Sequence, residues 1–492
     1  MPFGINDGAS LNSVPSPQKQ TLESNYIDFT SETTKGWAQQ YLPDLMEQEA
    51  EVFGNRSVSG FLEMVGAEEA MTADQVIWSE QGRLHLSYKG TVGTNTVSTI
   101  QLDTDVDGND VGTSHGVRVG DTVLVTSAAL TAKCYVSAIN VNTDGTAGTT
   151  TDFITVAPYT AEHLDDLGFG ADDAVGVFVF GSEFAKGKNG REGANTPAFK
   201  SFTNKPIILK DKYEVSGSDA SQIGWVEISG EEGQNGYLWY LKAAGDTRTR
   251  FTDYCEMSLL EAELAAASSG AEAAGVSGTE GLFAAVTDRG NIAYSFGDAA
   301  DPADTLNEFD AILAEFDRQG AIEEYMMFLN RTSALAVDDM LAAQNSYGAG
   351  GTSYGVFDND EDMAINLGFS GFRRGSYDFY KTDWKYLNDA ATRGGILDGA
   401  AGADGANAGE VKGMFVPAGV STVYDQTLGR NLKRPFLHVR YRASQMEDRR
   451  FKTWTTGSVG ASTSDLDAME MHFLTERCLV VQGANNFMML RG

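Results

Sequence analysis

The most constraining feature of the sequence is a series of short β-rich segments bracketed by two longer extended stretches. Between residues 91 and 181 the composition shifts to Val, Thr, Gly and Asp, and turn-forming residues separate the segments. Five segments have ordinary strand length, namely 96–102, 117–125, 132–140, 152–157 and 174–180. We expect these five strands to form a small β-barrel.

The bracketing stretches, residues 76–89 and 199–216, alternate apolar and polar side chains. The alternating apolar residues are Leu84, Leu86 and Tyr88 in the first stretch and Ile207, Leu209, Tyr213 and Val215 in the second. A period of two residues is typical of a strand with one wet face. The barrel is therefore expected to be inserted in a long hairpin, next to a loop rich in Gly, Lys and Asn at residues 187–196.

Residues 237–268 carry apolar side chains near the 3.6-residue period of a helix, with Gly270 as the stop. A continuous helix there spans about 45 Å, and Gly245 allows a kink. Such a helix is a backbone for a sheet or for neighbouring subunits, and a core helix is an equally common alternative.

Residues 281–435 indicate an α+β unit. Thr305 and Glu308 form a capping-box pattern at the start of a helix that ends at Gly320. A strand at 325–329, a helix at 333–344 and two loops of Gly and Ala at 348–355 and 394–409 follow. The C-terminal part returns to strands at 437–441, 469–473, 477–482 and 487–490.

Length and charge narrow the possible functions. The 492 residues predict two to four packed units, and no segment approaches the ~18 apolar residues of a membrane helix. A net charge of −33 disfavours general nucleic-acid binding, although a container for DNA tolerates it.

Residues 1–20 lack a secretory pattern and indicate a flexible arm. The isolated Cys134, Cys255 and Cys478 are expected to be buried thiols.

The sequence shows no constellation for catalysis, so we predict no catalytic, cofactor-binding or metal-binding residues. The five histidines, His85, His115, His163, His438 and His472, show no paired spacing. His85, His438 and His472 are expected on the polar faces of strands. Neither a phosphate-binding loop with its lysine nor a G-x-S-x-G elbow occurs.

Two acidic clusters are candidate metal sites. Asp103, Asp105, Asp107 and Gly108 match the first half of a calcium loop, but Ser114 stands where the bidentate glutamate belongs. A solvated turn is the favoured interpretation, and calcium is the alternative. The second cluster, Asp358, Asp360, Glu361 and Asp362, reads as an exposed loop.

A basic band lies near the C-terminus with aromatic residues beside it. Its members are Arg430, Lys433, Arg434, Arg440, Arg442, Arg449, Arg450 and Lys452. Such a band suits a nucleic-acid face, or it pairs with acidic surfaces of neighbouring identical subunits. In a chain of charge −33, contact between subunits is the favoured interpretation.

The order of polar arm, long hairpin, long helix, α+β unit and returning strands resembles the major capsid proteins of tailed bacteriophages, which have the Hong Kong ninety-seven fold. Residues 213–217 (Tyr-Glu-Val-Ser-Gly) are similar to a recurring capsid pattern, and residues 473–478 (Phe-Leu-Thr-Glu-Arg-Cys) to a capsid C-terminus. Residues 439–442 and 448–452 resemble capsid proteins of the crAss-like phage group. The inserted barrel departs from the minimal fold.

The resemblance implies an α+β fold with a defined set of parts. These are an N-terminal arm (1–71), an extended-loop hairpin (72–90 and 182–228), the inserted barrel (91–181), a spine helix (229–280), an axial domain (281–435) and C-terminal strands of the peripheral domain (436–492). Insertions at this point decorate the outer surface of relatives or clamp their neighbours.

The resemblance also implies a function. The chain would self-assemble into hexamers and pentamers of an icosahedral virion shell around double-stranded DNA, built in the host cytoplasm with portal and decoration proteins as partners. No residue matches the family's Lys–Asn cross-link, and loops 187–196 and 394–409 are expected to act as hinges. The alternative is a cell-surface adhesin that binds glycan or calcium.

Overall fold

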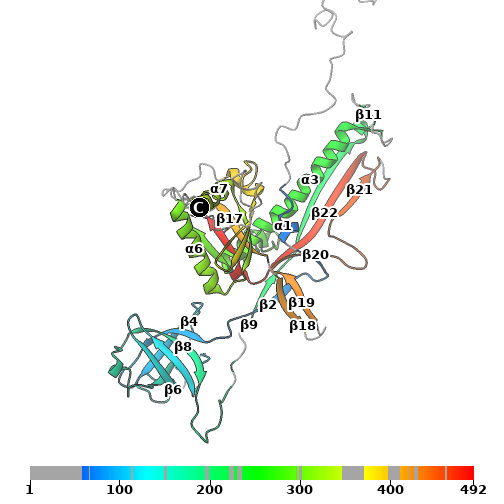
Figure 1. Ribbon diagram of the computed structural model, residues 1–492. Coiled ribbons are helices and arrows are strands. Elements are labelled where there is room, and N and C mark those ends of the chain that lie inside the picture. Colours follow the sequence, from blue (N-terminus) through cyan, green and yellow to red (C-terminus); the bar gives the residue numbers. More distant parts are fainter. Residues whose placement is uncertain are drawn as a thin grey trace, which may run out of the picture. The chain divides into compact units, whose positions relative to one another are not determined.

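The computed structural model shows an α+β chain (Figure 1). It describes residues 58–65, 67–111, 115–148, 152–193, 195, 199–220, 227–229, 235–294, 296–297, 302–345, 371–396, 410–418, 420–425, 430–459 and 462–492. Several expectations lie outside these residues: the arm before residue 58, loop 348–355, the acidic cluster at 358–362 and most of loop 394–409.

One sheet of five strands is organised around its longest strand. Its strands are β1 (Glu68–Met71), β10 (Ile207–Ser216), β20 (Leu437–Arg442), β21 (Lys452–Gly457) and β22 (Ala468–Val481). Strand β22 pairs with β10 and β21 through its first part and with β20 through its last part. It replaces the two strands predicted at 469–473 and 477–482. The polar pair Thr475 and Glu476 interrupts the apolar pattern but stays in the strand, buried and hydrogen-bonded.

Helix α3 (Leu238–Glu261) packs on one face of this sheet (Figure 1). Phe251 and Cys255 share a small core with Phe473 of β22. The helix continues through Gly245 and ends at Glu261, before the predicted end at residue 268. After Glu261 the chain enters a loop, in which Leu264 forms a β-bridge with Gly278.

A second sheet contains six strands in the order β13-β23-β17-β14-β16-β15. They are β13 (Asn291–Tyr294), β14 (Glu324–Leu329), β15 (Gly371–Arg374), β16 (Tyr377–Asp383), β17 (Val411–Pro417) and β23 (Met488–Arg491). Helices α6 (Pro302–Gln319) and α7 (Arg331–Asn345) share one core with alternate strand residues such as Met327 and Met488.

The intervening residues of β14 and β23, such as Phe328 and Met489, share another core with α1 (Phe61–Val65) and α5 (Leu282–Arg289). The sheet is thus covered on both faces. This explains why β14 and β23 read as unbroken apolar runs.

The start of α6 differs from the predicted capping box. The helix begins at Pro302, three residues before Thr305, because proline suits the first helical turn, where its missing N–H costs nothing. Thr305 is buried inside the helix, and the Glu308 carboxylate accepts a hydrogen bond from the Gly297 N–H at 3.0 Å. Glu308 therefore fastens the preceding loop to the helix instead of capping the helix start.

The predicted barrel is confirmed, with six strands instead of five. They are β3 (Ser87–Val92), β4 (Thr99–Asp105), β5 (Asp121–Thr126), β6 (Thr131–Val141), β7 (Phe153–Pro158) and β8 (Ala174–Ser182), closed in the order β3-β4-β7-β6-β5-β8. Small β-branched side chains such as Val123, Val177 and Ile154 fill the interior. The additional strand, β3, was expected to be part of the stretch 76–89.

The predicted strand at 76–89 is not continuous. It ends at Gln81, and Leu84 lies in a bend with its side chain 81% exposed. Its first part is β2 (Val76–Gln81), which pairs antiparallel with β9 (Phe199–Asn204). The barrel is therefore inserted between two paired strands. Strands β9 and β10 are separated at Pro206, which has no N–H for a ladder.

The remaining elements are short. Strands β18 (Val420–Asp425) and β19 (Arg430–Pro435) pair with each other, and β11 (Glu227–Ser229) and β12 (Asn235–Tyr237) pair within a small separate unit. The short helices are α2 (Gly217–Ala220), α4 (Gly270–Ala273), α9 (Arg393–Ile396) and the 3₁₀ turns η1 (Asp165–Leu167), η3 (Lys385–Leu387) and η4 (Ala484–Asn486). No helix in the described ranges is long and apolar enough to cross a membrane.

The three cysteines provide a test of the packing. All are buried, as predicted, and burial raises the pKa of Cys134 and Cys478 to about 12 and that of Cys255 to about 11. Because only the thiolate reacts, we expect iodoacetamide at about pH 8 to label none of them in the native chain and all three in denaturant, as counted by mass spectrometry. Rapid native labelling of any one would contradict the packing around it.

Candidate functional site

The Asp103–Asp107 turn is held by its own hydrogen bonds. One oxygen of Asp105 accepts the N–H groups of Asp107 at 2.9 Å and Asn109 at 2.8 Å, and the other accepts the Asn109 side chain. Asp107 pairs with Arg83 at 3.0 Å. Burial and the nearby Asp152 raise the pKa of Asp103. Among the described residues no three His, Cys, Asp or Glu side chains are grouped to hold a metal ion.

The histidines do not form a site. His85 is exposed in a bend and His115 is buried at the barrel, where burial lowers its pKa. The expectation that His438 lies on a polar strand face is wrong: the start of β20 is buried on both faces, and His438 is only 1% exposed between the buried Leu437 and Val439. His472 is half-buried and stacks on Trp454 with 5.0 Å between the ring centroids.

The described part of the basic band finds counter-charges within the chain. Arg440 pairs with Glu69 at 2.9 Å, and Arg450 pairs with Glu68 at 2.5 Å. Glu68 and Glu69 lie on β1, which adds to β20 in parallel. The band therefore clamps an early segment of the chain onto the edge of the C-terminal sheet, and the predicted contact between subunits is not needed to neutralise it.

A buried carboxylate lies at the centre of this band. Glu476 of β22, whose side chain is 4% exposed, lies 3.1 Å from Arg442 and 2.9 Å from Arg449. Lys452 lies farther out and pairs with the exposed Glu447 at 2.8 Å. The side chains of Arg430, Lys433 and Arg434 lie outside the described part of the chain.

A second anchor, which the sequence analysis missed, holds residues 58–62 on helix α3. Asp253 accepts the N–H groups of Val58 and Ser59, both at 3.1 Å. Glu256 accepts those of residues 60–62 at 2.6 to 3.3 Å. These donors include the first N–H groups of α1, which have no partner within the helix. Two carboxylates on α3 thus cap α1 from a distant part of the sequence.

The same segment is locked by an aromatic contact. Phe61 is 4% exposed and stacks on Trp384, with ring centroids 4.4 Å apart and planes at 18°. It also meets the edge of Phe328. The only sequence signal for this anchor was the pair of acids at positions 253 and 256, placed among the apolar residues of the predicted helix.

The ribbon formed by β2 and β9 has two unlike faces. One carries Trp78 and Phe202 and is turned toward other parts of the large unit, which comprises residues 57–223 and 239–492. The opposite face has no charged residue, and all six of its side chains are exposed: Ile77, Ser79, Gln81, Phe199, Ser201 and Thr203. Ile77 is 65% and Phe199 61% exposed. We call this surface the uncharged ribbon face.

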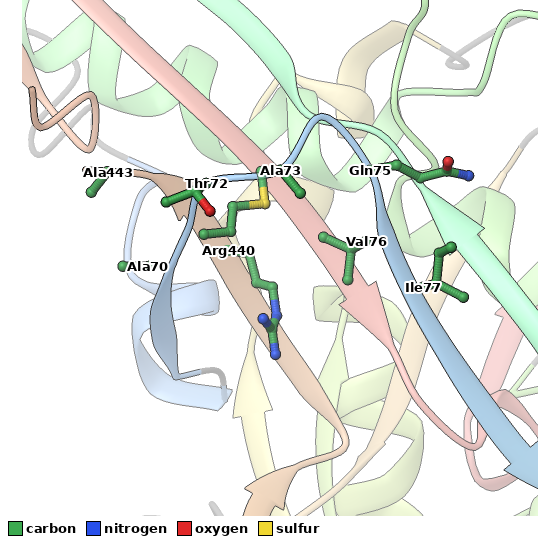
Figure 2. Close-up of a pocket in the computed structure, with 9 residues that line it drawn as sticks. Ala70, Thr72, Ala73, Gln75, Val76, Ile77, Arg440 and Ala443 are labelled. Carbon is green, nitrogen blue, oxygen red and sulfur yellow. The ribbon is translucent and has the colours of Figure 1, made fainter.

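A hollow of about 400 Å³ lies between β1, the start of β2 and β20 (Figure 2). Its lining is mostly aliphatic, with Thr72, Gln75 and Arg440 as the polar side chains. Arg440 is already paired with Glu69. The hollow therefore lacks a base beside a nucleophile.

A hollow of similar size lies between β13 and α6. It contains the carboxylates of Glu308 and Glu315. Glu308 is bonded to the Gly297 N–H, and Glu315 to Arg318 and Gln319. The charged side chains that line the two hollows, Arg440, Glu308 and Glu315, therefore all have partners within the chain.

A scan against models of protein families and a search of curated proteins each gave no match. Solved phage-type capsids are similar in structure. The capsid of a native GTA particle is 9% identical with a TM-score of 0.39, and the match covers 95% of this chain and 99% of that one. The structure of Microbacterium phage Oxtober96 is 9% identical with a TM-score of 0.35, and the match covers 92% of this chain and 95% of that one. The capsid of cyanophage P-SCSP1u is 9% identical with a TM-score of 0.34, and the match covers 63% of this chain and 79% of that one.

Glu476→Gln tests the buried cluster that Glu476 forms with Arg442 and Arg449. Removing this charge leaves Arg442 and Arg449 without the carboxylate that they share, and we expect a loss of about 1–3 kcal/mol in the free energy of unfolding. The matched control Glu447→Gln breaks an exposed pair and should cost much less, because solvent screens such a pair. Urea unfolding of the unassembled chain measures the free energy of unfolding of both variants. Equal losses would argue against a structural role for the Glu476 cluster.

Glu256→Gln tests the anchor at α3 through its pH dependence. Burial raises the pKa of Glu256, opposed by the N–H groups of residues 60–62. The stabilising contribution is then complete below the pKa of the unfolded chain and is lost as pH rises through the folded pKa. Relative to the variant, the natural chain should lose stability from about pH 4.5 upward.

Urea unfolding across that pH range gives this difference for Glu256→Gln and for the exposed control Glu263→Gln. The control, at an exposed side chain, should leave the stability close to that of the natural chain. A difference at Glu256 that is constant or rises with pH would contradict the anchor's electrostatics.

Proposed function

We propose that this chain is the major capsid protein of a tailed bacteriophage, a subunit that assembles with copies of itself into a closed shell. The observation that carries the proposal is the uncharged ribbon face. The Trp78 and Phe202 face of the ribbon packs on the rest of the chain, whereas the opposite face has no such cover. Six exposed uncharged side chains in a chain of charge −33 indicate a surface made for contact with another molecule.

A second copy of the chain is the occupant that this face suits best. The ribbon is present in every copy, so a ring of subunits can repeat one heterologous contact. Many modest interfaces of this kind add up to a stable shell. In the proposed fold, the Hong Kong ninety-seven fold, the ribbon corresponds to the extended loop, and α3 to the spine helix.

The other parts follow the resemblance: the arm (1–71), the extended loop (72–90 and 182–228), the barrel (91–181), the spine (229–280), the axial domain (281–435) and the peripheral strands (436–492). Hexamers and pentamers, enclosed double-stranded DNA, portal and decoration partners, a virion location with assembly in the host cytoplasm and the absence of enzymatic activity belong to the same proposal. A chain of charge −33 lets DNA be packed and released without adhering to the wall. Membership of the crAss-like group stays a prediction.

Electron microscopy of the purified chain tests this function. Shells, ring oligomers or tubes are the expected result. A stable monomer that binds glycan or calcium would instead favour the alternative, a cell-surface adhesin.

The double variant Ile77→Glu and Phe199→Glu tests the ribbon face. Two new carboxylates should repel a neighbouring acidic subunit and remove apolar contact area, raising the protein concentration needed for assembly about tenfold or more. Because both side chains are exposed, the thermal midpoint of the monomer should hardly change. Light scattering measures assembly, with Val276→Glu, at another exposed apolar residue, as the control. Unchanged assembly by the double variant would rule out the ribbon face as an interface.

A further inference from the structure

The root of the β2–β9 ribbon is fixed by one buried arginine. Arg289, at the end of α5, has a side chain only 9% exposed. Its guanidinium lies 4.4 Å from the centroid of the Phe202 ring on β9 and 5.6 Å from that of Trp78 on β2. A single side chain therefore touches both strands of the ribbon.

Carboxylates hold this guanidinium in position. Glu280 accepts from Arg289 at 2.7 Å, and Glu80 of β2 lies 3.8 Å from the guanidinium. Glu80 also accepts the Trp78 indole N–H at 3.0 Å and the Gly483 N–H at 2.9 Å. Strand β2 is thereby tied to α5 and to the turn after β22.

Asn204 ties strand β9 in the same way. Its side chain is 1% exposed, and its amide group donates to the carbonyls of Leu479 at 2.7 Å and Glu280 at 2.9 Å. Its oxygen accepts from the Glu280 N–H at 2.7 Å and from the Thr279 hydroxyl at 3.2 Å. The amide thus joins the end of the ribbon to the 279–280 loop and to β22.

We propose that Arg289 and Asn204 are positioning residues that set the direction in which the ribbon leaves the sheets, and hence the angle between neighbouring subunits. Strand β2 is tied at its root through Glu80 and strand β9 through Asn204, and Arg289 contacts both strands, so rotation of the ribbon would break some of these contacts. This inference rests on the proposed function only where it concerns the angle between subunits.

The planar shape of arginine is essential to this arrangement. Guanidinium stacks on aromatic rings while its edge bonds carboxylates, whereas an ammonium group is a compact point charge that cannot do both. Lysine at position 289 would keep Glu80 and Glu280 neutralised but lose the stacking on the ribbon. The Arg289→Lys variant therefore separates ribbon position from charge balance.

Hydrogen exchange of the full unassembled chain tests the ribbon root directly. In Arg289→Lys, amides of residues 76–81 and 199–204 should exchange about tenfold faster, while those of β14 keep their rates. Arg318→Lys, on α6 and 71% exposed, is the matched control and should change neither region. Unchanged ribbon exchange, or an equal increase in β14, would overturn the positioning role.

Asn204→Ser provides a second variant that keeps a small polar group but loses the donors to Leu479 and Glu280. It should also speed exchange of 199–204, and unchanged exchange there would remove Asn204 from the proposal. Electron microscopy of assembled variants then measures particle diameters, which should spread more widely than in the natural chain. A diameter spread equal to the natural one would overturn the link to subunit angle, whereas a natural chain that never assembles would overturn the proposed function and leave the exchange result standing.

Discussion

Strand β22 is the element on which the large unit depends. Its first part packs Phe473 against α3, and its last part packs Leu479 and Val481 in the core shared with α1 and α5. One continuous strand thus joins two hydrophobic cores. The burial of Glu476 midway follows from this continuity, because the strand cannot bend away to expose a charge, and the surrounding arginines are what make its position tolerable.

The early part of the chain is attached to this frame by polar contacts and by a short apolar segment. Glu68 and Glu69 bring β1 to the edge of the sheet, and Asp253 and Glu256 hold the segment before α1. Val58, Phe61 and Leu62 bury their side chains in the core. Charge, hydrogen bonding and this apolar contact together fix where the early segment lies. Apolar burial fixes the helices and sheets to which it attaches.

Periodicity predicted the elements whose pattern is local. The barrel, the long helix, α7 and β14 were all expected from apolar spacing, with errors at their ends. The break at Leu84 and the burial of His438 were missed because they depend on long-range packing. The break at Pro206 has a local cause, the missing N–H of proline, which the alternating pattern around it concealed. The Glu69 partner of Arg440, the Phe202 ring beside Arg289 and the Leu479 partner of Asn204 could not be predicted, because each lies far away in the sequence and no local spacing encodes it.

The closed barrel between β2 and β9 also has a practical consequence. A closed barrel leaves no unpaired strand edge, so it adds no template for aggregation wherever it is carried. Its two connections leave from Gln81 and return at Phe199, which are directly paired across the ribbon. Any compact domain whose ends lie equally close satisfies the same geometry. The site between these two residues is therefore a natural place to graft a foreign domain for display.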